Sequence, residues 1–249
     1  MEPIKEYIGV IEYDANFYGI VSAIIAILIT LVIFFVFRRK RVSRRNVLIT
    51  GLTESGKTVL FSRLVSNKKV TTYASMKENI AVLTVSKNKT ITVIDVPGNE
   101  RLRYKYIEEF LFTTRGIIYV LDSLNIQKEI RDVAGYLFML LQEPYVHDYR
   151  VPFLIACNKQ DHAVSKSAKV IQSLLEKEIN ALRITQTGRL SSTSTTEEKV
   201  FLGHRGKDFQ FADLKSLKVE FIECSAAEPG EGEPKEILKP LWAWLEKVA

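Results

Sequence analysis

Cysteine and histidine are scarce in this chain of 249 residues. The sequence holds two cysteines and three histidines. Two cysteines cannot form the framework of a small disulfide-bonded secreted domain, and they agree with a reducing compartment. The histidines, His147, His162 and His204, match no catalytic or metal-binding spacing. A disulfide-stabilised scaffold and a histidine-based metal site are therefore not indicated.

Internal repeats and a broad basic surface are also missing. No repeat with a period of about 20 to 50 residues is visible, which argues against a solenoid or a propeller. The net charge of +6 comes largely from residues 38–45, of which six are Arg or Lys. We therefore expect no direct specific binding to nucleic acid. The length allows one large domain, or one domain with an appendage.

Charge is absent from residues 18–37, which are mainly Ile, Leu, Val, Phe and Ala. At about 1.5 Å per residue, a helix of this length measures roughly 30 Å, the thickness of the hydrocarbon core of a bilayer. A cleaved signal peptide fits poorly, because residues 1–17 are acidic and the apolar run is long. A buried core helix would rarely be apolar on every face. We predict a transmembrane helix over residues 18–37.

The basic segment 38–45 directly follows this predicted span. Positively charged residues beside a membrane span stay in the cytosol. We therefore interpret residues 1–17 as a short lumenal or external segment and residues 38–45 as a juxtamembrane linker. Residues 46–249 then form a cytosolic domain.

Apolar runs and helical periodicity alternate along residues 46–249. The apolar runs predict strands at 46–50, 80–85, 90–96, 116–122, 153–157 and 219–224, and the periodicity predicts helices at 57–67, 126–141, 166–182 and 237–248. This order is typical of an α/β fold with a six-stranded, mostly parallel sheet, whose ligands bind beyond the carboxyl ends of the strands. A polar insertion, residues 185–216, interrupts the order. We expect its first half to be a mobile loop and its second half a short edge strand.

The first motif lies between a predicted strand and a predicted helix, where residues 51–58 read GLTESGKT. The pattern is that of a phosphate-binding loop, in which glycines let backbone amides point at a β-phosphate. Lys57 would reach the β- and γ-phosphates, and the Thr58 hydroxyl would bind the bridging Mg²⁺. The predicted phosphate-binding residues are Gly51, Leu52, Thr53, Glu54, Ser55, Gly56, Lys57 and Thr58.

The second motif follows the third predicted strand, where residues 91–100 read ITVIDVPGNE. Asp95 ends that strand and could hold a Mg²⁺-bound water, and the amide of Gly98 could meet a γ-phosphate. The sequence D-x-P-G also forms ordinary turns. Its weight therefore comes from its position after the phosphate-binding loop.

The third motif follows the fifth predicted strand and ends in Asn158, Lys159 and Asp161, within FLIACNKQD. The Asp161 carboxylate could accept hydrogen bonds from the ring N–H and the exocyclic amine of guanine, a pair that adenine lacks. We expect Asn158 to brace the phosphate-binding loop and the Lys159 stem to lie along the base. The site would therefore select guanine.

The fourth motif, ECSA at residues 223–226, ends the last predicted strand. Ser225 and the backbone amide of Ala226 are its candidate guanine contacts, with the amide donating to the guanine carbonyl. Two simpler predictions concern nearby residues. Cys157 and Cys224 should be small buried thiols, and Trp242 and Trp244 should point to different faces of the last helix, one of them into the core.

Together the four motifs have the order and spacing of small GTPases, a resemblance that covers residues 46–249. Five features resemble the family of signal recognition particle receptor β subunits, which are Arf- and Sar-like. They are the preceding span, V-P-G in place of a second glycine pair, RGIIYVLDS at 115–123, FLIACNKQD and the polar insertion. The resemblance implies a P-loop small-GTPase fold, GTP or GDP with Mg²⁺ as cofactors, and a receptor α subunit as the partner of the GTP form.

The same resemblance implies a cellular setting. The protein would be a single-pass protein of the endoplasmic reticulum membrane, with its N-terminus lumenal and its GTPase domain cytosolic. Its role would lie in co-translational protein targeting. The ribosome and the translocon are further candidate partners.

Two site residues follow from the resemblance. Asn99 stands at the catalytic position, where many GTPases carry Gln and this family often carries His. Asn reaches one methylene less far than Gln and cannot act as a base, so we expect slow hydrolysis that a partner can complete. Among the switch hydroxyls of Thr71, Thr72 and Ser75, alignment to the family favours Ser75 as a second Mg²⁺ ligand, beside Thr58 and, through water, Asp95.

Two other functions stay open on sequence alone. In the first, GTP is a long-lived structural ligand of a membrane scaffold that does not hydrolyse it. In the second, the chain is an anchored Arf- or Sar-like trafficking GTPase that is unrelated to ribosome targeting. Phosphate release would separate a switch from a scaffold, and capture of coat proteins would indicate trafficking.

Overall fold

The computed structural model of the chain describes residues 15–39, 44–68, 70–72, 75–86, 89–190, 200–214, 216–226 and 238–249. For residues 15–19, 33–39 and 187–190 it describes the backbone alone. The chain divides into two compact units, Met1–Ser43 and Arg44–Ala249. Each unit is considered by itself.

The described part of the first unit forms helix α1, over Ala15–Arg39. The side chains described in α1, residues 20–32, are all exposed, and none of them is charged. The Thr30 hydroxyl donates to the carbonyl of Ala26 at 2.7 Å, so its polar group is satisfied within the helix. No helix among the described residues is long and apolar enough to cross a membrane. A membrane span over residues 18–37 stays a prediction.

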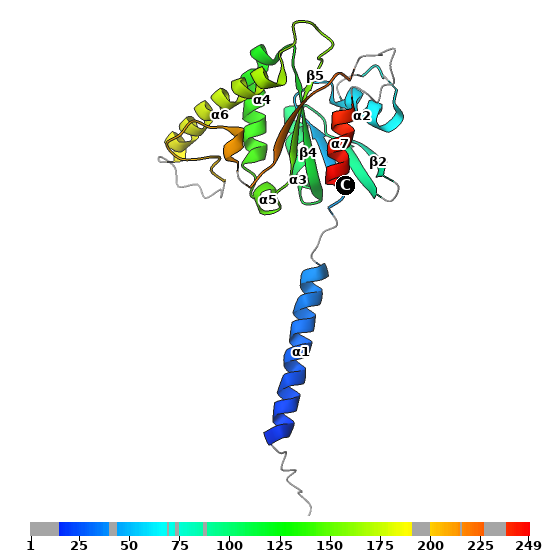
Figure 1. The fold of residues 1–249 in the computed structure, drawn as a ribbon, viewed down its shortest axis with the longest axis vertical. Coiled ribbons are helices and arrows are strands. Elements are labelled where there is room, and N and C mark those ends of the chain that lie inside the picture. Colours follow the sequence, from blue (N-terminus) through cyan, green and yellow to red (C-terminus); the bar gives the residue numbers. More distant parts are fainter. Residues whose placement is uncertain are drawn as a thin grey trace, which may run out of the picture. The chain divides into compact units, whose positions relative to one another are not determined.

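The second unit is built on a six-stranded sheet with the order β2-β3-β1-β4-β5-β6 (Figure 1). Strand β2 is antiparallel to β3, and the other neighbouring strands are parallel. The predicted six-stranded, mostly parallel sheet is thereby confirmed. Its strands are β1 (Asn46–Thr50), β2 (Asn79–Ser86), β3 (Lys89–Asp95), β4 (Thr114–Asp122), β5 (Phe153–Asn158) and β6 (Val219–Glu223).

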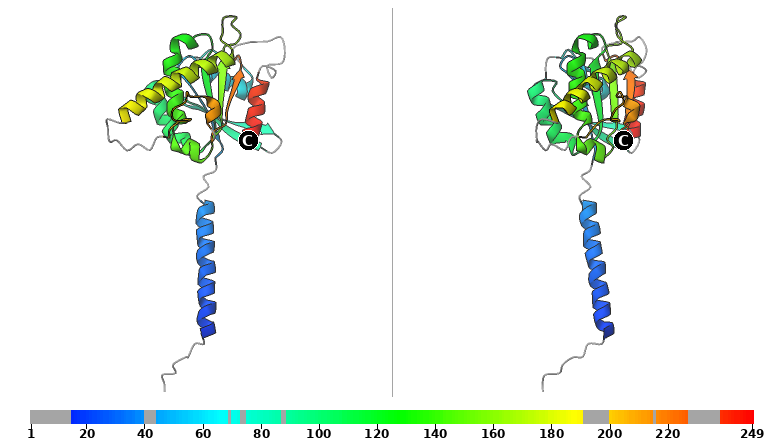
Figure 2. Two further views of the ribbon diagram at one scale, coloured as in Figure 1. Left: turned by 60° about the vertical axis from the view of Figure 1, so that its left-hand side comes forward. Right: turned by 90° about the vertical axis from the view of Figure 1, so that its left-hand side faces the viewer.

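Helices cover both faces of this sheet. Successive side chains of each strand point to opposite faces, so each strand contributes to two cores. Leu48 of β1 belongs to the core beneath α3, α4 and α6, whereas its neighbours Val47 and Ile49 belong to the core beneath α2 and α7. Figures 1 and 2 show α4 and α6 side by side and α7 on the other side of the sheet. The helices are α2 (Lys57–Ser66), α3 (Glu100–Leu111), α4 (Ile126–Leu141), α5 (Pro144–Asp148), α6 (Ala168–Leu190) and α7 (Lys239–Val248).

The polar insertion differs from its prediction at both ends. Residues 185–190 continue α6, and residues 191–199 lie outside the described part. The predicted edge strand is wrong, because Phe211–Asp213 forms a turn of 3₁₀ helix. The Phe211 amide donates to the Glu176 carboxylate of α6 at 3.1 Å, and the Phe211 ring packs on Phe221 of β6 with 5.1 Å between centroids. The segment therefore turns inward onto α6.

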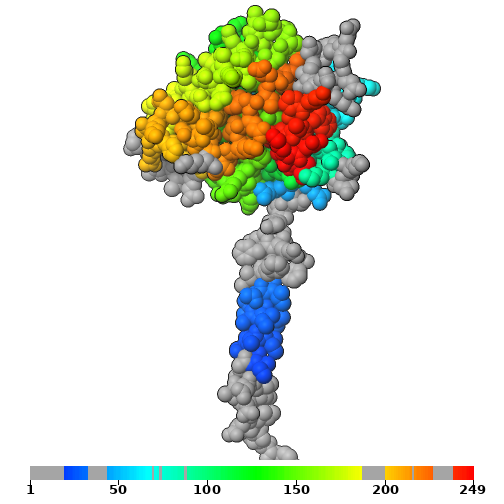
Figure 3. Space-filling view, in the orientation of Figure 1, coloured from blue at the N-terminus to red at the C-terminus, as the bar shows by residue number. Residues whose placement is uncertain are grey.

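The last helix packs against β4 through Trp244. Trp244 is fully buried, whereas Trp242 is partly exposed, so the predicted division of the two indoles is confirmed. A Cβ on Gly116 of β4 would lie 2.8 Å from the Trp244 ring. Glycine at position 116 therefore makes room for the indole. Figure 3 shows α7 (red) beside the part of the chain around β6 (orange) on the surface of the second unit.

We expect Trp244→Ala to lower the free energy of unfolding by about 3–5 kcal/mol, because it leaves a cavity between α7 and β4. Trp242→Ala is the matched control and should cost much less. Urea unfolding followed by circular dichroism measures both. Equal losses for the two variants would contradict this account of the core.

Candidate nucleotide-binding site

The four motifs meet at one edge of the sheet, because the strands that carry them are parallel and end there. Asn158, the last residue of β5, connects three of them. Its Nδ2 donates to the carbonyl of Ser55 at 2.8 Å, and its Oδ1 accepts from the amide of Ala226 at 2.9 Å. Asn158 is 1% exposed. The predicted bracing of the phosphate-binding loop thus matches a contact in the structure.

The loop between β1 and α2 requires its glycines. Gly51 and Gly56 have φ of 145° and 89°. A Cβ on Gly51 would lie 2.1 Å from the carbonyl oxygen of Val120, and one on Gly56 would lie 2.2 Å from Asn158 Nδ2. Gly56 also precedes α2 without a side-chain cap. No side chain at the N-cap therefore occupies the first amides of α2. Free amides at a helix start are what an anion-binding site requires.

Lys57 is buried at the start of α2. Its Nζ donates to the carbonyl of Leu52 at 2.6 Å. Burial lowers the pKa of Lys57 to about 8, which the Asp95 charge opposes and the Arg103 charge reinforces. A Cβ on Gly98 would lie 2.7 Å from Lys57 Nζ and 2.7 Å from the Thr53 amide nitrogen. The loop after β3 thus approaches the phosphate-binding loop closely.

The three predicted Mg²⁺ residues lie together. The Thr58 hydroxyl donates to Asp95 Oδ2 at 2.8 Å and lies 3.1 Å from the Ser75 hydroxyl. Thr71 and Thr72, the alternatives to Ser75, are exposed. Asn79 donates a further hydrogen bond to Asp95 Oδ2 at 2.9 Å.

The other carboxylate oxygen of Asp95 shows whether the chemistry of this place suits a cation. Asp95 Oδ1 is buried and has no hydrogen-bond partner among the described residues. Burial raises the pKa of this carboxyl, against the hydrogen bonds from Asn79 and Thr58. A buried carboxylate oxygen beside two hydroxyls is the oxygen donor set that Mg²⁺ and its waters prefer. The residues present therefore fit Mg²⁺.

The predicted guanine-binding residues lie at the ends of β5 and β6. The Ser225 hydroxyl donates to Asp161 Oδ1 at 2.6 Å, which orients the carboxylate. Lys159 has a φ of 66° and forms an ion pair with Asp122 at 2.7 Å. Burial acts to raise the pKa of Asp122, but hydrogen bonds from Lys159, Asn125 and the Leu124 amide hold it below its usual value. Asp122 thereby fixes the Lys159 stem.

Asn99 is the N-cap of α3, and its Oδ1 accepts from the amide of Arg101 at 3.1 Å. The side chain is exposed. The oxygen of the residue at the predicted catalytic position is therefore engaged at the start of a helix.

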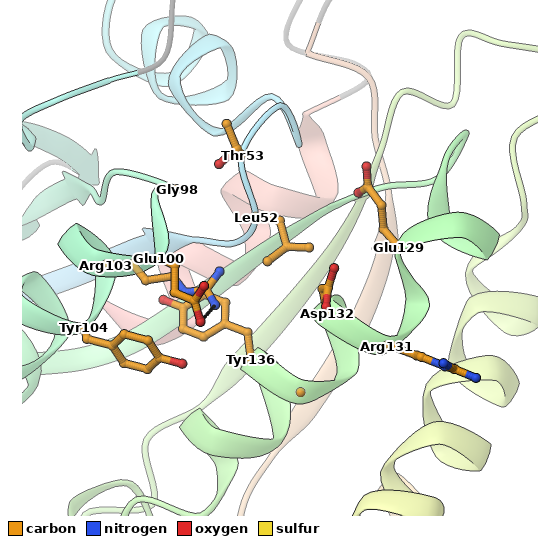
Figure 4. A pocket seen from close by; sticks show the side chains of 11 residues that line it. Leu52, Thr53, Gly98, Glu100, Arg103, Tyr104, Glu129, Arg131, Asp132 and Tyr136 are labelled. Atoms are coloured by element: carbon orange, nitrogen blue, oxygen red, sulfur yellow. Dashed lines mark ion pairs between the residues drawn. The ribbon is translucent and has the colours of Figure 1, made fainter.

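Sequence reasoning missed three residues of the site, namely Asn79, Asp122 and Arg103. Arg103 is 8% exposed, its guanidinium lies 4.2 Å from the centroid of the Tyr136 ring, and its Nε has no hydrogen-bond partner among the described residues. Arg103 and Tyr136 line a cavity of about 580 Å³ that also reaches Thr53 and Gly98 (Figure 4). No motif signals these roles, since each depends on a contact between distant segments.

Known proteins resemble this chain over most of its length. A sequence profile of the family described as signal recognition particle receptor beta subunit matches residues 42–219. Signal recognition particle receptor subunit beta of Homo sapiens is 43% identical over 244 residues, which are 96% of this chain and 89% of that protein.

Solved structures agree with this finding. A chain of the mammalian SRP receptor is 40% identical, with a TM-score of 0.71 over 82% of this chain and 100% of that one. A chain of the SRb-GTP/SRX complex from Chaetomium thermophilum, at 19% identity, has a TM-score of 0.65 and covers 81% of this chain and 99% of its own. The second unit therefore has the α/β fold of the small GTPases.

We expect the buried Lys57 to make the stability of the ligand-free chain depend on pH. Lys57 titrates near 8 in the folded state and near 10.4 when unfolded. Between these values the unfolded state binds more protons, so the free energy of unfolding rises with pH, and below about pH 8 the full cost of burying the charge remains.

The measurement compares wild type with Lys57→Met by urea unfolding without nucleotide. From pH 7.5 to 9.5 the wild type should gain about 1–2 kcal/mol relative to this variant. Lys177→Met, at an exposed position of α6, is the control and should track the wild type. If the curves of Lys57→Met and wild type ran parallel, Lys57 would not titrate in this range.

Proposed function

Because this chain belongs to the family of signal recognition particle receptor β subunits, we propose that it is a GTP-dependent switch whose GTP form holds the receptor α subunit at the endoplasmic reticulum membrane. One observation carries the proposal. Asn158 joins the phosphate-binding loop to the residues predicted to read guanine, so that one ligand could contact both ends of the site.

The related SRb of Chaetomium thermophilum is described in complexes with GTP and SRX, with GDP, and with GDP and magnesium. These descriptions support guanine nucleotide and Mg²⁺ as ligands and an SRX-containing subunit as partner. In this chain, the amides of residues 51–56 and Gly98 and the ammonium of Lys57 bind phosphate. Thr58 and Ser75 would hold Mg²⁺, and Asp95 would act through a bound water. When bound, Mg²⁺ neutralises phosphate charge.

The base is read at the far end of the site. Asp161, oriented by Ser225, accepts both guanine donors. The Ala226 amide donates to Asn158 Oδ1, so it would have to share or give up that bond to reach the guanine carbonyl. The Lys159 stem, held by Asp122, lies along the base. Adenine lacks this pair of donors, so Asp161 would lose both bonds to the base and keep only the one from Ser225.

Hydrolysis is slow in the isolated chain and is completed by a partner. The Asn99 oxygen caps α3, so water positioning depends on a group from outside. The same contact favours the second candidate, a membrane scaffold that keeps GTP as a structural ligand. An anchored Arf- or Sar-like trafficking GTPase remains the third candidate.

The chain is anchored by α1 as a single-pass membrane protein. The large aliphatic side chains described on α1 are between 37% and 60% exposed, an arrangement that costs free energy in water and none in lipid. The basic residues 38–45 place the GTPase domain in the cytosol and residues 1–17 in the lumen. The ribosome and the translocon are further candidate partners.

We expect Asp161→Asn to weaken GTP binding by about 100-fold or more and to strengthen binding of xanthosine triphosphate, because the amide presents a donor where the carboxylate accepted. Competition against a fluorescent nucleotide measures both affinities. Asp148→Asn, at an exposed position of α5, is the matched control and should bind as the wild type does. Equal binding of ATP and GTP by the unchanged chain would end the guanine assignment.

We expect the GTP-loaded chain to bind the receptor α subunit at least about tenfold more tightly than the GDP-loaded chain, because a switch requires differential affinity. Biolayer interferometry with each loaded form measures this ratio. Single-turnover phosphate release with and without the α subunit accompanies it. Equal binding of both forms, together with retained GTP, would favour the scaffold over the switch.

A further inference from the structure

The edge of the sheet opposite the nucleotide site is basic. Among the described residues, every parallel strand has a cation at its amino end, and these ends share one edge. All but Arg115 are exposed, and Arg115 is partly exposed. The cations are Arg44 and Arg45 before β1, Lys89 at the start of β3, Arg115 near the start of β4, Arg150 before β5 and Lys218 before β6.

Acidic side chains near this edge cancel only part of that charge. Glu220 of β6 pairs with Lys218 at 3.1 Å and with Lys247 of α7 at 3.4 Å. The other acids on neighbouring elements are Glu108 and Glu109 in the last turns of α3, Glu143, Asp148, and Glu246 of α7. Among the described residues, Asp148 forms no ion pair with Arg44 or Arg150. With Lys247, the cations at this edge outnumber these acids by one, and Arg44, Arg45 and Arg150 form no ion pair within the described part of the chain.

Three aromatic rings stand at the same place. The Phe112 and Tyr145 ring centroids are 5.3 Å apart, and those of Tyr145 and Tyr149 are 4.4 Å apart. The Tyr145 hydroxyl donates to the carbonyl of Phe112 at 2.7 Å, which ties α5 to the turn between α3 and β4. Phe112 is 60% exposed and Tyr149 is 50% exposed. Exposing the apolar surface of Phe112 and Tyr149 to water costs free energy.

Arg44 links the rings to the start of β1. Its guanidinium lies 4.6 Å from the centroid of the Tyr149 ring and donates to the Tyr149 carbonyl at 3.5 Å. Figure 1 shows α5 at the same end of the second unit as the start of β1. Amphipathic aromatic rings favour the interface between lipid and water, and cations favour anionic headgroups. Arg44, Phe112, Tyr145, Tyr149 and Arg150 are called the basal cluster below.

The chain itself indicates what covers the basal cluster. Arg44 is seven positions after Phe37, where the apolar run ends. Seven extended residues reach at most about 25 Å, so an anchored chain keeps the basal cluster within reach of the bilayer surface. This step rests on the membrane anchoring proposed above.

We propose that the basal cluster docks on the anionic phospholipid headgroups of the membrane that holds the anchor. The nucleotide site lies at the opposite edge of the sheet and faces away from the bilayer. Docking thus presents the switch segments to cytosolic partners.

The test measures which edge of the domain approaches lipid headgroups. The full chain is reconstituted into vesicles of phosphatidylcholine and phosphatidylserine that contain a headgroup nitroxide lipid. A fluorophore is attached at Asp148→Cys, beside the basal cluster, or at Val164→Cys, which is 69% exposed and follows the carboxyl end of β5. Cys157 and Cys224 are buried and do not compete for the label.

We expect quenching at position 148 to be several-fold stronger than at position 164. Removing phosphatidylserine should reduce this difference, as should raising the salt from 0.1 M to 1 M, where the Debye length falls from about 10 Å to about 3 Å. Arg44→Gln with Arg150→Gln should abolish most of it. Lys169→Gln with Lys177→Gln, at exposed positions of α6, is the matched control and should leave it unchanged.

Equal quenching at the two positions would overturn the proposal. So would a difference in quenching that stays the same when phosphatidylserine is removed, the salt is raised or the arginines are substituted. Vesicle flotation separates this failure from failure of the anchor. If the chain floats with vesicles but shows no selective quenching, only the docking is wrong. If the chain does not float, the anchoring and the docking are both wrong.

Discussion

The candidate site depends on one buried amide, that of Asn158. With one donated and one accepted hydrogen bond it holds the phosphate-binding loop at Ser55 and the end of the last strand at Ala226. Because the amide is 1% exposed, each partner left unsatisfied would cost about 1–3 kcal/mol. Gly56 must lack a Cβ for the amide to fit. The loop is therefore shaped before any ligand arrives, and a ligand need not supply the ordering free energy itself.

The parallel sheet divides the functions of the second unit between its two edges. At the carboxyl edge, Gly51 follows β1, Asp95 ends the adjacent β3, and Asn158 ends β5, which β4 separates from β1. A single elongated ligand could contact all three. At the amino edge, the strands leave cations and the aromatic rings of the basal cluster. A contact at one edge does not compete with a contact at the other. The proposed nucleotide binding and the proposed docking could therefore occur at once.

Strands and motifs were predictable because local sequence decides them. Buried parallel strands such as β4 and β5 are continuous apolar runs, and α4 was predicted over its full range because its apolar face repeats at helical spacing. Helix α3 was missed since it buries Arg103 and Tyr106 among charged residues. The edge strand predicted from Phe209 and Phe211 was wrong because α6 offers Glu176 and the Arg183 guanidinium to this segment. Tertiary contacts of that kind leave no periodic signal.

The pair formed by Lys57 and Asp95 links the cost of the folded site to its use. Burial lowers the pKa of the lysine and raises that of the carboxyl, so each charge is held at a cost that the other only partly offsets. Asp95 Oδ1 has no partner among the described residues, and Lys57 uses a backbone carbonyl of its own loop. In the proposed function, a hydrated cation would give Asp95 Oδ1 its partner, and phosphate would pair with the Lys57 charge. Binding would therefore remove a cost that folding has already incurred. Loss of a phosphate would restore that cost near Gly98, which lies close to Lys57 Nζ and two positions before α3. A site of this kind can transmit the state of its ligand to a neighbouring helix even where hydrolysis itself is slow.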